Sequence, residues 1–476
     1  MSSQSHDRQQ QEIWQEVDKS DEDWNELRAS RLPANLEMKA IELGAWRRSR
    51  EVRSIGDLLR ALLVLAALGF SFQRLAMWAT LKGIAHISEC AWRKRMQKSA
   101  VWIAWLLCEL LSVQSAPSWL DTPRANRILL IDATRLRIPG GTGDDVRLHW
   151  SYDLLSGKTQ EVAISDRHQA EGLSWFKLLP GDITVTDAGY PAGTTVQIVL
   201  KQHADAVTRT TASHLRLETE KGERIDLKSR LLRQPYGKAR HIMGWVKAPD
   251  GERYQVRLVA YRLPKEVAVQ AQARKRQRLQ EKRGKNFNQE LVWWAGWILL
   301  ITTLPLEFWS DEEVAQLYRA RWQVELVFKR LKQGLNWHGV SIKDWDHLTT
   351  LVQLKLIVWC LQEQEQLWMR EHLLELNQLP QRDWQEVGCE QDEANVEQDG
   401  ADPQWVLSNW LLTQQCLQDL CLLLRGRWSR QHLQCCLPLL QRYLFSRKRK
   451  MRIHQESTSR TWLFQKVAQL MPLSAA

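Results

Sequence analysis

The stretch DITVTDAGYPAGTTVQIVLKQHADAVTRT, residues 182–210, decides the fold of this chain. It begins with a run of β-prone residues that ends in Asp187, and it closes with ADAVTRT, which has the same character. The segment between them has apolar residues at helical spacing. A strand, a helix and a second strand in this order predict an α/β fold.

The residues upstream extend this α/β unit. RILLIDATRLRI (127–138) predicts a short apolar strand that ends in Asp132. Two more strand patterns follow it, VRLHWSYDLL (146–155) and KTQEVAISD (158–166), and AEGLSWFKLL (170–179) predicts a helix. The order of three strands, helix, strand, helix and strand is typical of an α/β domain.

Residues 211–290 interrupt this domain with short β-like segments, which predict a β-rich insertion. The insertion ends in the basic stretch ARKRQRLQEKRGKN (273–286), which we interpret as a solvated helix or as an arm that becomes ordered on binding. A buried strand is predicted in LVWWAGWILLITTLP (291–305), and a helix follows it.

The regions on either side of the α/β domain have helical patterns. An acidic stretch within the second of them indicates a linker. The expected domains are 1–120, which is helical; 121–345, the α/β domain with its insertion at about 211–290; and 346–476, a helical C-terminal region with the linker at about 388–404.

Two short helices are predicted in the N-terminal region, at 71–83 and 88–99. The second carries Arg93, Lys94 and Arg95, so the pair resembles a helix-turn-helix whose cations lie near DNA phosphates. An ordinary helical bundle with a basic surface fits the same pattern equally well.

The composition favours a polyanionic partner such as nucleic acid, because the net charge is +11 and the pI is near 9.3. The first thirty residues are polar and acidic, so we expect no secretory signal. The apolar runs at 61–72 and 291–304 fall short of the roughly 18–20 residues that span a bilayer, so we expect no membrane partner. The eight cysteines form no C-x-x-C pair, which indicates reduced thiols in a cytoplasmic protein.

The segment LYRARWQVELVFKRLKQ (317–333) predicts an amphipathic helix. Four of its polar residues fall within about 60° of one another, at about 100° per residue: Tyr318, Arg321, Glu325 and Lys332. We expect Arg321 and Lys332 to lie off the buried face of the helix. A solvated face with a few ion pairs between successive turns fits the same spacing.

Asp132, Asp187 and Glu325 are the candidate catalytic and metal-binding residues. An aspartate that ends an apolar strand is costly unless a metal ion or hydrogen bonds compensate its charge. The carboxyl ends of parallel strands meet at one edge of a sheet, so we expect the two aspartates to converge and Glu325 to join them. Three converging carboxylates predict two Mg²⁺ ions, with Mn²⁺ as an alternative, that activate a nucleophile against a phosphodiester. The alternative is that the aspartates merely begin turns.

The spacing Y-x2-R-x3-E-x6-K within 318–332 resembles the Tyr–Arg–Glu–Lys signature of one family of bacterial insertion-sequence transposases, which belongs to the DDE transposases. LLIDATRL (129–136) and GDITVTDAGY (181–190) are similar to the two aspartate blocks of that family, and the likeness covers about 50–345. Ala188 departs from the pattern, because the family usually has arginine there.

The resemblance implies a ribonuclease-H-like core with a β-rich insertion, and a DNA transposase that cleaves and transfers the strands of an insertion sequence. It implies that Glu325 is the third metal ligand and that Tyr318 positions the terminal strand. Three cations are expected to hold the phosphates around the scissile bond, namely Arg321, Lys329 and Lys332.

Trp322 and Trp297 are expected to stack on a base drawn from the duplex, and packing in the core is the alternative for each. The expected partners are double-stranded DNA, as the terminal inverted repeats and the target, and a second copy of the chain in a synaptic complex at the bacterial nucleoid. Two other functions fit the residues, a ribonuclease-H-like nuclease without strand transfer and a catalytically inactive DNA-binding regulator.

Overall fold

The computed structural model describes residues 22–47, 51–113, 127–137, 144–283, 286–335, 344–377, 405–407, 409–425 and 445–447. The chain divides into two compact units. The sheet unit comprises Gln114–Leu136, Asp145–Phe328 and His454–Ala476, and the helical unit comprises Met1–Val113, Arg137–Asp144 and Lys329–Ile453. The predicted linker at 388–404 lies outside the described residues.

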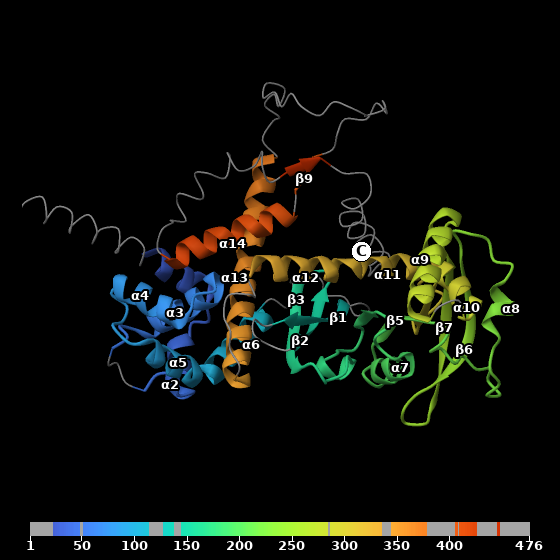
Figure 1. Cartoon of the computed structure of the whole chain (residues 1–476), viewed down its shortest axis with the longest axis horizontal. Helices are drawn as coiled ribbons and strands as arrows, with labels where there is room; N and C mark the ends of the chain where they lie inside the picture. Colours follow the sequence, from blue (N-terminus) through green and yellow to red (C-terminus); the bar gives the residue numbers. More distant parts are fainter. Residues whose placement is uncertain are drawn as a thin grey trace, which may run out of the picture. The chain divides into compact units, whose positions relative to one another are not determined.

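The sheet unit is built on a mixed sheet of eight strands in the order β3-β2-β1-β4-β5-β8-β7-β6 (Figure 1). β1, β4 and β5 run parallel, whereas β8 is antiparallel to β5 and begins an antiparallel extension with β7 and β6. The strands are β1 Ile128–Arg137, β2 Asp144–Asp153, β3 Lys158–Asp166, β4 Ile183–Thr186, β5 Asp205–Thr210, β6 Ala239–Lys247, β7 Arg253–Arg262 and β8 Trp297–Thr302.

The strand–helix–strand unit predicted for 182–210 is confirmed as β4, helix α7 (Ala192–Lys201) and β5. Val196 and Val199 of α7 are fully buried, because apolar residues three apart share one face of a helix. Val199 packs in a core cluster with residues of β1 and β5, so α7 holds the two parallel strands in place.

The helix predicted at 170–179 is wrong, because only the 3-10 turn η1 (Leu173–Trp175) forms there. The backbone amides of Lys177 and Leu179 donate to the carboxylates of Glu161 and Asp182 instead of to helical carbonyls. Side-chain acceptors of this kind compete with helix formation.

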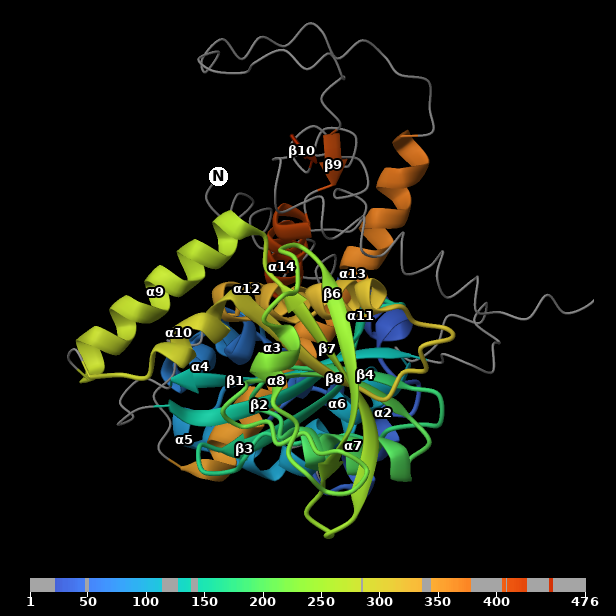
Figure 2. The ribbon, with the colours of Figure 1, turned by 90° about the vertical axis from the view of Figure 1, so that its right-hand side faces the viewer.

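The insertion contains helices as well as the predicted strands. β6 and β7 confirm two of the β-like segments, but the segment at 224–232 contains helix α8 (Leu227–Leu231), capped by Asp226. The basic stretch lies mostly on helix α9 (Lys265–Arg283), and the short α10 (Gln289–Trp293) and η2 (Trp294–Gly296) lead into β8 (Figure 2).

The helix predicted after β8 is divided into α11 (Asp311–Ala320) and α12 (Trp322–Gly334). α11 begins with a capping box, in which Ser310 and Glu313 satisfy each other's backbone amides. At the junction the amides of Arg321 and Val324 bond to carbonyls three residues back rather than four, which tightens the chain into a 3-10 turn.

The helical unit confirms the N-terminal helices and part of the C-terminal helical region. The predicted helices at 71–83 and 88–99 form behind serine caps at Ser71 and Ser88. A small antiparallel strand pair is formed by β9 (Trp405–Leu407) and β10 (Phe445–Arg447). The helices of this unit are α2 Leu36–Glu42, α3 Ile55–Leu68, α4 Phe72–Leu81, α5 Glu89–Lys98, α6 Ala100–Val113, α13 Trp345–Asn377 and α14 Asn409–Arg425. No helix in the described ranges has the length and apolar character needed to cross a membrane.

Candidate active site

Asp132 and Asp187 lie on neighbouring parallel strands. Leu130 of β1 is beside Val185 of β4, and the same register continued by two residues places Asp132 beside Asp187. β4 stops one residue before Asp187, whereas β1 continues for five residues beyond Asp132, so Asp132 lies within its strand and not at its end as predicted. Paired strands are about 4.8 Å apart, so the two aspartates belong to one site.

Asp132 is a half-buried carboxylate between a guanidinium and a backbone amide. Arg321 Nη1 donates to Asp132 Oδ2 at 2.9 Å, and the amide of Ala133 donates to Oδ1 at 2.8 Å. Burial raises the pKa of Asp132 to about 6; Arg321 opposes this shift, and Asp187 and Glu171 add to it. The negative charge of Asp132 is therefore only partly compensated by Arg321.

Arg321 joins Asp132 to Glu325. Arg321 Nη2 donates to Glu325 Oε1 at 2.5 Å, so one guanidinium binds carboxylates that are far apart in the sequence. The Arg321 side chain is only 13% exposed, and the expectation that it lies off the buried face is therefore wrong. Its guanidinium enters the interior because the two carboxylates supply the countercharge that water would otherwise supply.

The other residues of the predicted polar stripe differ in exposure. Tyr318 is buried, its ring centre is 5.8 Å from the Arg321 guanidinium carbon, and its hydroxyl has no hydrogen-bond partner within the described ranges. Trp322 is 44% exposed, and Lys329 and Lys332 are exposed on the turns of α12 that follow Glu325. A ligand from solvent can therefore reach Trp322 and both lysines.

Trp297 lies in the core of the extension. It is 5% exposed, and its ring centre is 5.1 Å from that of Trp293 and 6.2 Å from that of Trp294. Apolar residues of β6, β7 and β8 complete this cluster. The structure therefore favours core packing over base stacking for Trp297.

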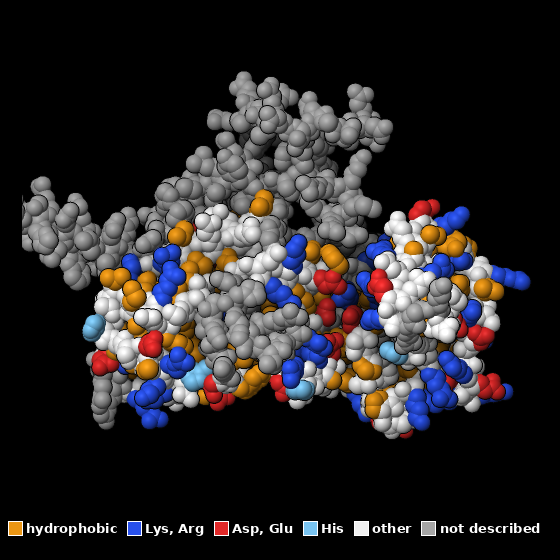
Figure 3. Space-filling model, in the orientation of Figure 1, with side chains coloured by type: hydrophobic (Ala, Val, Ile, Leu, Met, Phe, Trp, Pro, Cys, Tyr) orange, Lys and Arg blue, Asp and Glu red, His pale blue; other side chains and the backbone are white. Residues whose placement is uncertain are grey.

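Basic side chains are distributed over several surfaces. Arg93 and Lys94 are exposed on α5 and Arg95 is half-buried, while α9 exposes most of its cations. The guanidinium carbon of Arg93 lies 4.9 Å from the ring centre of Phe72 on α4. Figure 3 shows Lys and Arg in separate groups on the face in view, so charge alone does not identify the DNA-binding surface.

Glu171 is a further carboxylate of this site that sequence reasoning missed. It lies in the loop between β3 and β4 and contributes to the raised pKa of Asp132. A Cβ added at Gly189 would lie 2.4 Å from Glu171 Oε2 and 3.0 Å from Asp187 Oδ1. The glycine two residues after Asp187 is the one feature of the sequence that hinted at such a close approach.

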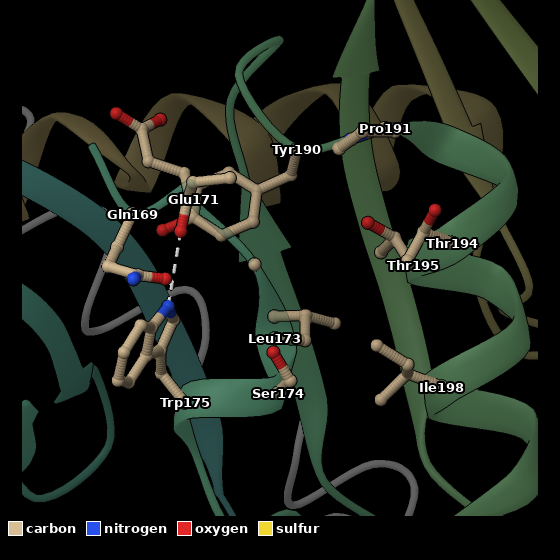
Figure 4. Close-up of a pocket in the computed structure, with 12 residues that line it drawn as sticks. Gln169, Glu171, Leu173, Ser174, Trp175, Tyr190, Pro191, Thr194, Thr195 and Ile198 are labelled. Carbon is tan, nitrogen blue, oxygen red and sulfur yellow. Dashed lines mark hydrogen bonds between the residues drawn. The ribbon is translucent and has the colours of Figure 1, made fainter.

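A cavity of about 280 Å³ adjoins the carboxylates on the side of α7. Figure 4 shows the Trp175 indole on one wall, with Nε1 donating to the Ala170 carbonyl at 3.1 Å, and the carboxylate of Glu171 directed away from Leu173 and Ile198. Apolar groups and hydroxyls therefore make up most of the cavity lining, Glu171 lies at its edge, and Asp132 and Asp187 are not among the lining residues.

The donor set of this site suits a divalent metal ion, because Mg²⁺ and Mn²⁺ bind carboxylate oxygens, and the absence of a side chain at Gly189 lets two of the carboxylates approach one another. As the side chains stand, no group of three His, Cys, Asp or Glu within the described ranges is close enough to hold one ion. Arg321 lies between Asp132 and Glu325, so an ion shared by these two carboxylates requires Arg321 to release one of them.

Comparison with known proteins gives matches that agree with one another. Residues 123–361 match the family described as Transposase DDE domain. The chain is 31% identical over 317 residues to InsL of Escherichia coli strain K12, named for insertion sequence element IS186A, and 31% identical over 318 residues to the IS421 transposase of Escherichia coli; each match covers 66% of this chain and 85% of the relative. It is also 23% identical to the IS231B transposase of Bacillus thuringiensis subsp. berliner over 64% of this chain and 70% of that protein.

Proposed function

Since this chain belongs to the DDE transposases of bacterial insertion sequences, we propose that Asp132, Asp187 and Glu325 are its catalytic carboxylates. The enzymes of this family cleave DNA and transfer the cut strand, depend on divalent metal ions and have a ribonuclease-H-like catalytic domain. The observation that carries the proposal is the link between the three acids: the register of β1 and β4 brings Asp132 beside Asp187, and Arg321 bonds to both Asp132 and Glu325.

Asp132, Asp187 and Glu325 would hold two Mg²⁺ ions, which supply an activated water and stabilise the leaving oxygen of a phosphodiester. The chain's own contribution is to carry Asp132 on β1, Asp187 directly after β4 and Glu325 on α12, and to hold Arg321 against two of these carboxylates. Release of one carboxylate would leave the guanidinium of Arg321 available to a substrate phosphate, which it can bind through two parallel hydrogen bonds.

Lys329 and Lys332 would bind phosphates next to the scissile bond, because both are exposed on the helix that carries Glu325. Tyr318 would position the terminal strand through Arg321, against which its ring packs. Trp322 is the remaining candidate for stacking on a base, since its indole is exposed.

The substrate is the DNA of the insertion sequence, and we place two copies of the chain in a synaptic complex, because two element ends must be joined to one target. The bacterial nucleoid is then the site of action. The transposase names of the relatives favour strand transfer over simple nuclease activity.

Metal-dependent cleavage of a duplex that carries the element ends tests the proposed function. Cleavage should stop when the metal is chelated, and the Mg²⁺ concentration for half-maximal rate should rise as the pH falls from 8 to 5.5. The reason is that the pKa of Asp132 is raised to about 6, so protons compete with the metal in this window. A metal requirement that is equal at both pH values would contradict a role for Asp132 as a ligand.

Charge reversal on α5 tests DNA recognition. The double variant Arg93→Glu, Lys94→Glu should weaken binding to element ends and reduce the slope of log affinity against log salt by about one for each phosphate that the variant no longer binds. The control reverses Arg274 and Lys275 on α9, which are equally exposed. If the salt dependence of binding is unchanged in the α5 variant and reduced in the control, the DNA-recognition surface lies on α9 and not on α5.

A further inference from the structure

Glu171 and Asp187 approach each other above Gly189. The point where a Cβ would stand on Gly189 is 2.4 Å from Glu171 Oε2 and 3.0 Å from Asp187 Oδ1. Both oxygens therefore lie next to the space over Gly189 that a side chain would fill, so the missing side chain lets the two carboxylates approach one another closely enough to share one cation. Asp187 Oδ1 also accepts a hydrogen bond from the Gly189 amide at 2.7 Å, which orients that carboxylate.

These two carboxylates lack the compensation that Asp132 has. Asp132 is ion-paired with Arg321, whereas neither Glu171 nor Asp187 forms an ion pair with any described residue. Arg147 and Arg135 act on Glu171 without forming an ion pair with it, and the Arg147 guanidinium donates to the Gln169 carbonyl. Two neighbouring acids with no cation in direct contact create a demand for positive charge.

Tyr190 supplies an independent indication of a ligand. The residue is 1% exposed, and its hydroxyl makes no hydrogen bond within the part of the chain that the structure describes. Asp132, Glu171 and Asp187 all act on this hydroxyl electrostatically, as does Arg147, so the hydroxyl lies near the acids. A buried hydroxyl without a partner costs about 1–3 kcal/mol, which a bound oxygen in the cluster would relieve.

We propose that Glu171 is a fourth carboxylate of the metal centre, and that Glu171 and Asp187 together bind one divalent cation whose shell includes an oxygen that hydrogen-bonds to Tyr190. The proposal rests on the proposed function, because it extends the same metal site. In this arrangement Glu171 is a ligand of the second ion. Glu325, which is 35% exposed and bonded to Arg321, then does not have to bind that ion. Oxygen donors from carboxylates are what Mg²⁺ and Mn²⁺ prefer.

Binding of Mn²⁺ to the full-length protein without DNA, followed by calorimetry, tests the proposal. Glu171→Gln should weaken the binding of one ion by about 10–100-fold, a loss typical of removing groups that support a metal. Glu161→Gln is the matched control, because Glu161 is also a half-buried glutamate of the sheet unit but binds the Lys177 amide outside the cluster. The control should bind Mn²⁺ as the unmodified protein does.

Gly189→Ala provides a second variant that leaves every charge in place. Its methyl group would displace the Glu171 carboxylate, so it should reproduce the loss of Mn²⁺ affinity, and the Mg²⁺ concentration needed for cleavage should rise in both variants. Normal Mn²⁺ binding by both Glu171→Gln and Gly189→Ala would overturn the proposal. Asp187→Asn distinguishes failure of this proposal from failure of the proposed function. If Asp187→Asn also binds Mn²⁺ normally, the proposed metal site fails as a whole. If Asp187→Asn alone binds Mn²⁺ weakly, the metal site stands and only Glu171 is removed from it.

Discussion

The Asp132→Asn variant is expected to lose DNA cleavage by at least about 10³-fold while its melting temperature rises. The pKa of Asp132 is raised to about 6 by burial, above the value of about 3.9 in an unfolded chain. The folded state therefore holds this proton more tightly than the unfolded state, and stability is lost as the pH rises through about 6. Removing the charge should increase the free energy of unfolding by up to about 3 kcal/mol at pH 8 and by nearly nothing at pH 4.

Asp182→Asn is the matched control for this experiment. Asp182 directly precedes the strand that Asp187 follows. It is fully buried and accepts hydrogen bonds from Arg127 at 2.6 Å and from the Leu179 amide at 2.7 Å. Its substitution should destabilise by about 3–5 kcal/mol, because it leaves the Arg127 charge without its partner. Thermal melts at pH 4 and 8 compare the two variants. A fall in the melting temperature of Asp132→Asn like that of Asp182→Asn would show that Asp132 is a structural residue.

Arg321→Ala should reduce cleavage by orders of magnitude and also destabilise the protein in a pH-dependent manner. Without the guanidinium, Asp132 and Glu325 face each other with no cation between them. We expect the free energy of unfolding to fall by about 2–4 kcal/mol at pH 8, because the substitution leaves two partly desolvated carboxylates without their counterion. The loss should shrink at pH 5, where Asp132, with its pKa raised to about 6, is protonated.

Phe328→Ala on the next helix provides the contrast. Phe328 is 7% exposed and packs edge-on against Trp150, with ring centres 6.0 Å apart. Its truncation should cost about 3–5 kcal/mol at both pH values, because a cavity carries no charge. Melting temperature and cleavage rate per folded molecule separate the two variants. If Arg321→Ala cleaved DNA at the normal rate per folded molecule, the guanidinium would serve only to stabilise the fold.

The strands and most of the helices could be predicted because their signals are local. The apolar and β-branched residues of β1 and β4 and the helical spacing of α7 each lie within one element. The helix expected at 170–179 failed because the acceptors that prevent it, Glu161 and Asp182, belong to other elements. The helix α8 was missed for a different reason, because its cap at Asp226 is a local signal that the short apolar pattern of 224–232 concealed.

The sequence by itself determined the α/β order of elements, the two strand-associated aspartates and the spacing of Tyr318, Arg321, Glu325 and Lys332, because each depends on residues close together in the chain. Only the tertiary structure decided which groups meet: that Arg321 is held between Asp132 and Glu325, that Trp297 packs in the core, and that Glu171 approaches Asp187 over Gly189. Burial and electrostatic pairing arise from contacts between distant segments, and a one-dimensional pattern contains no distance between them.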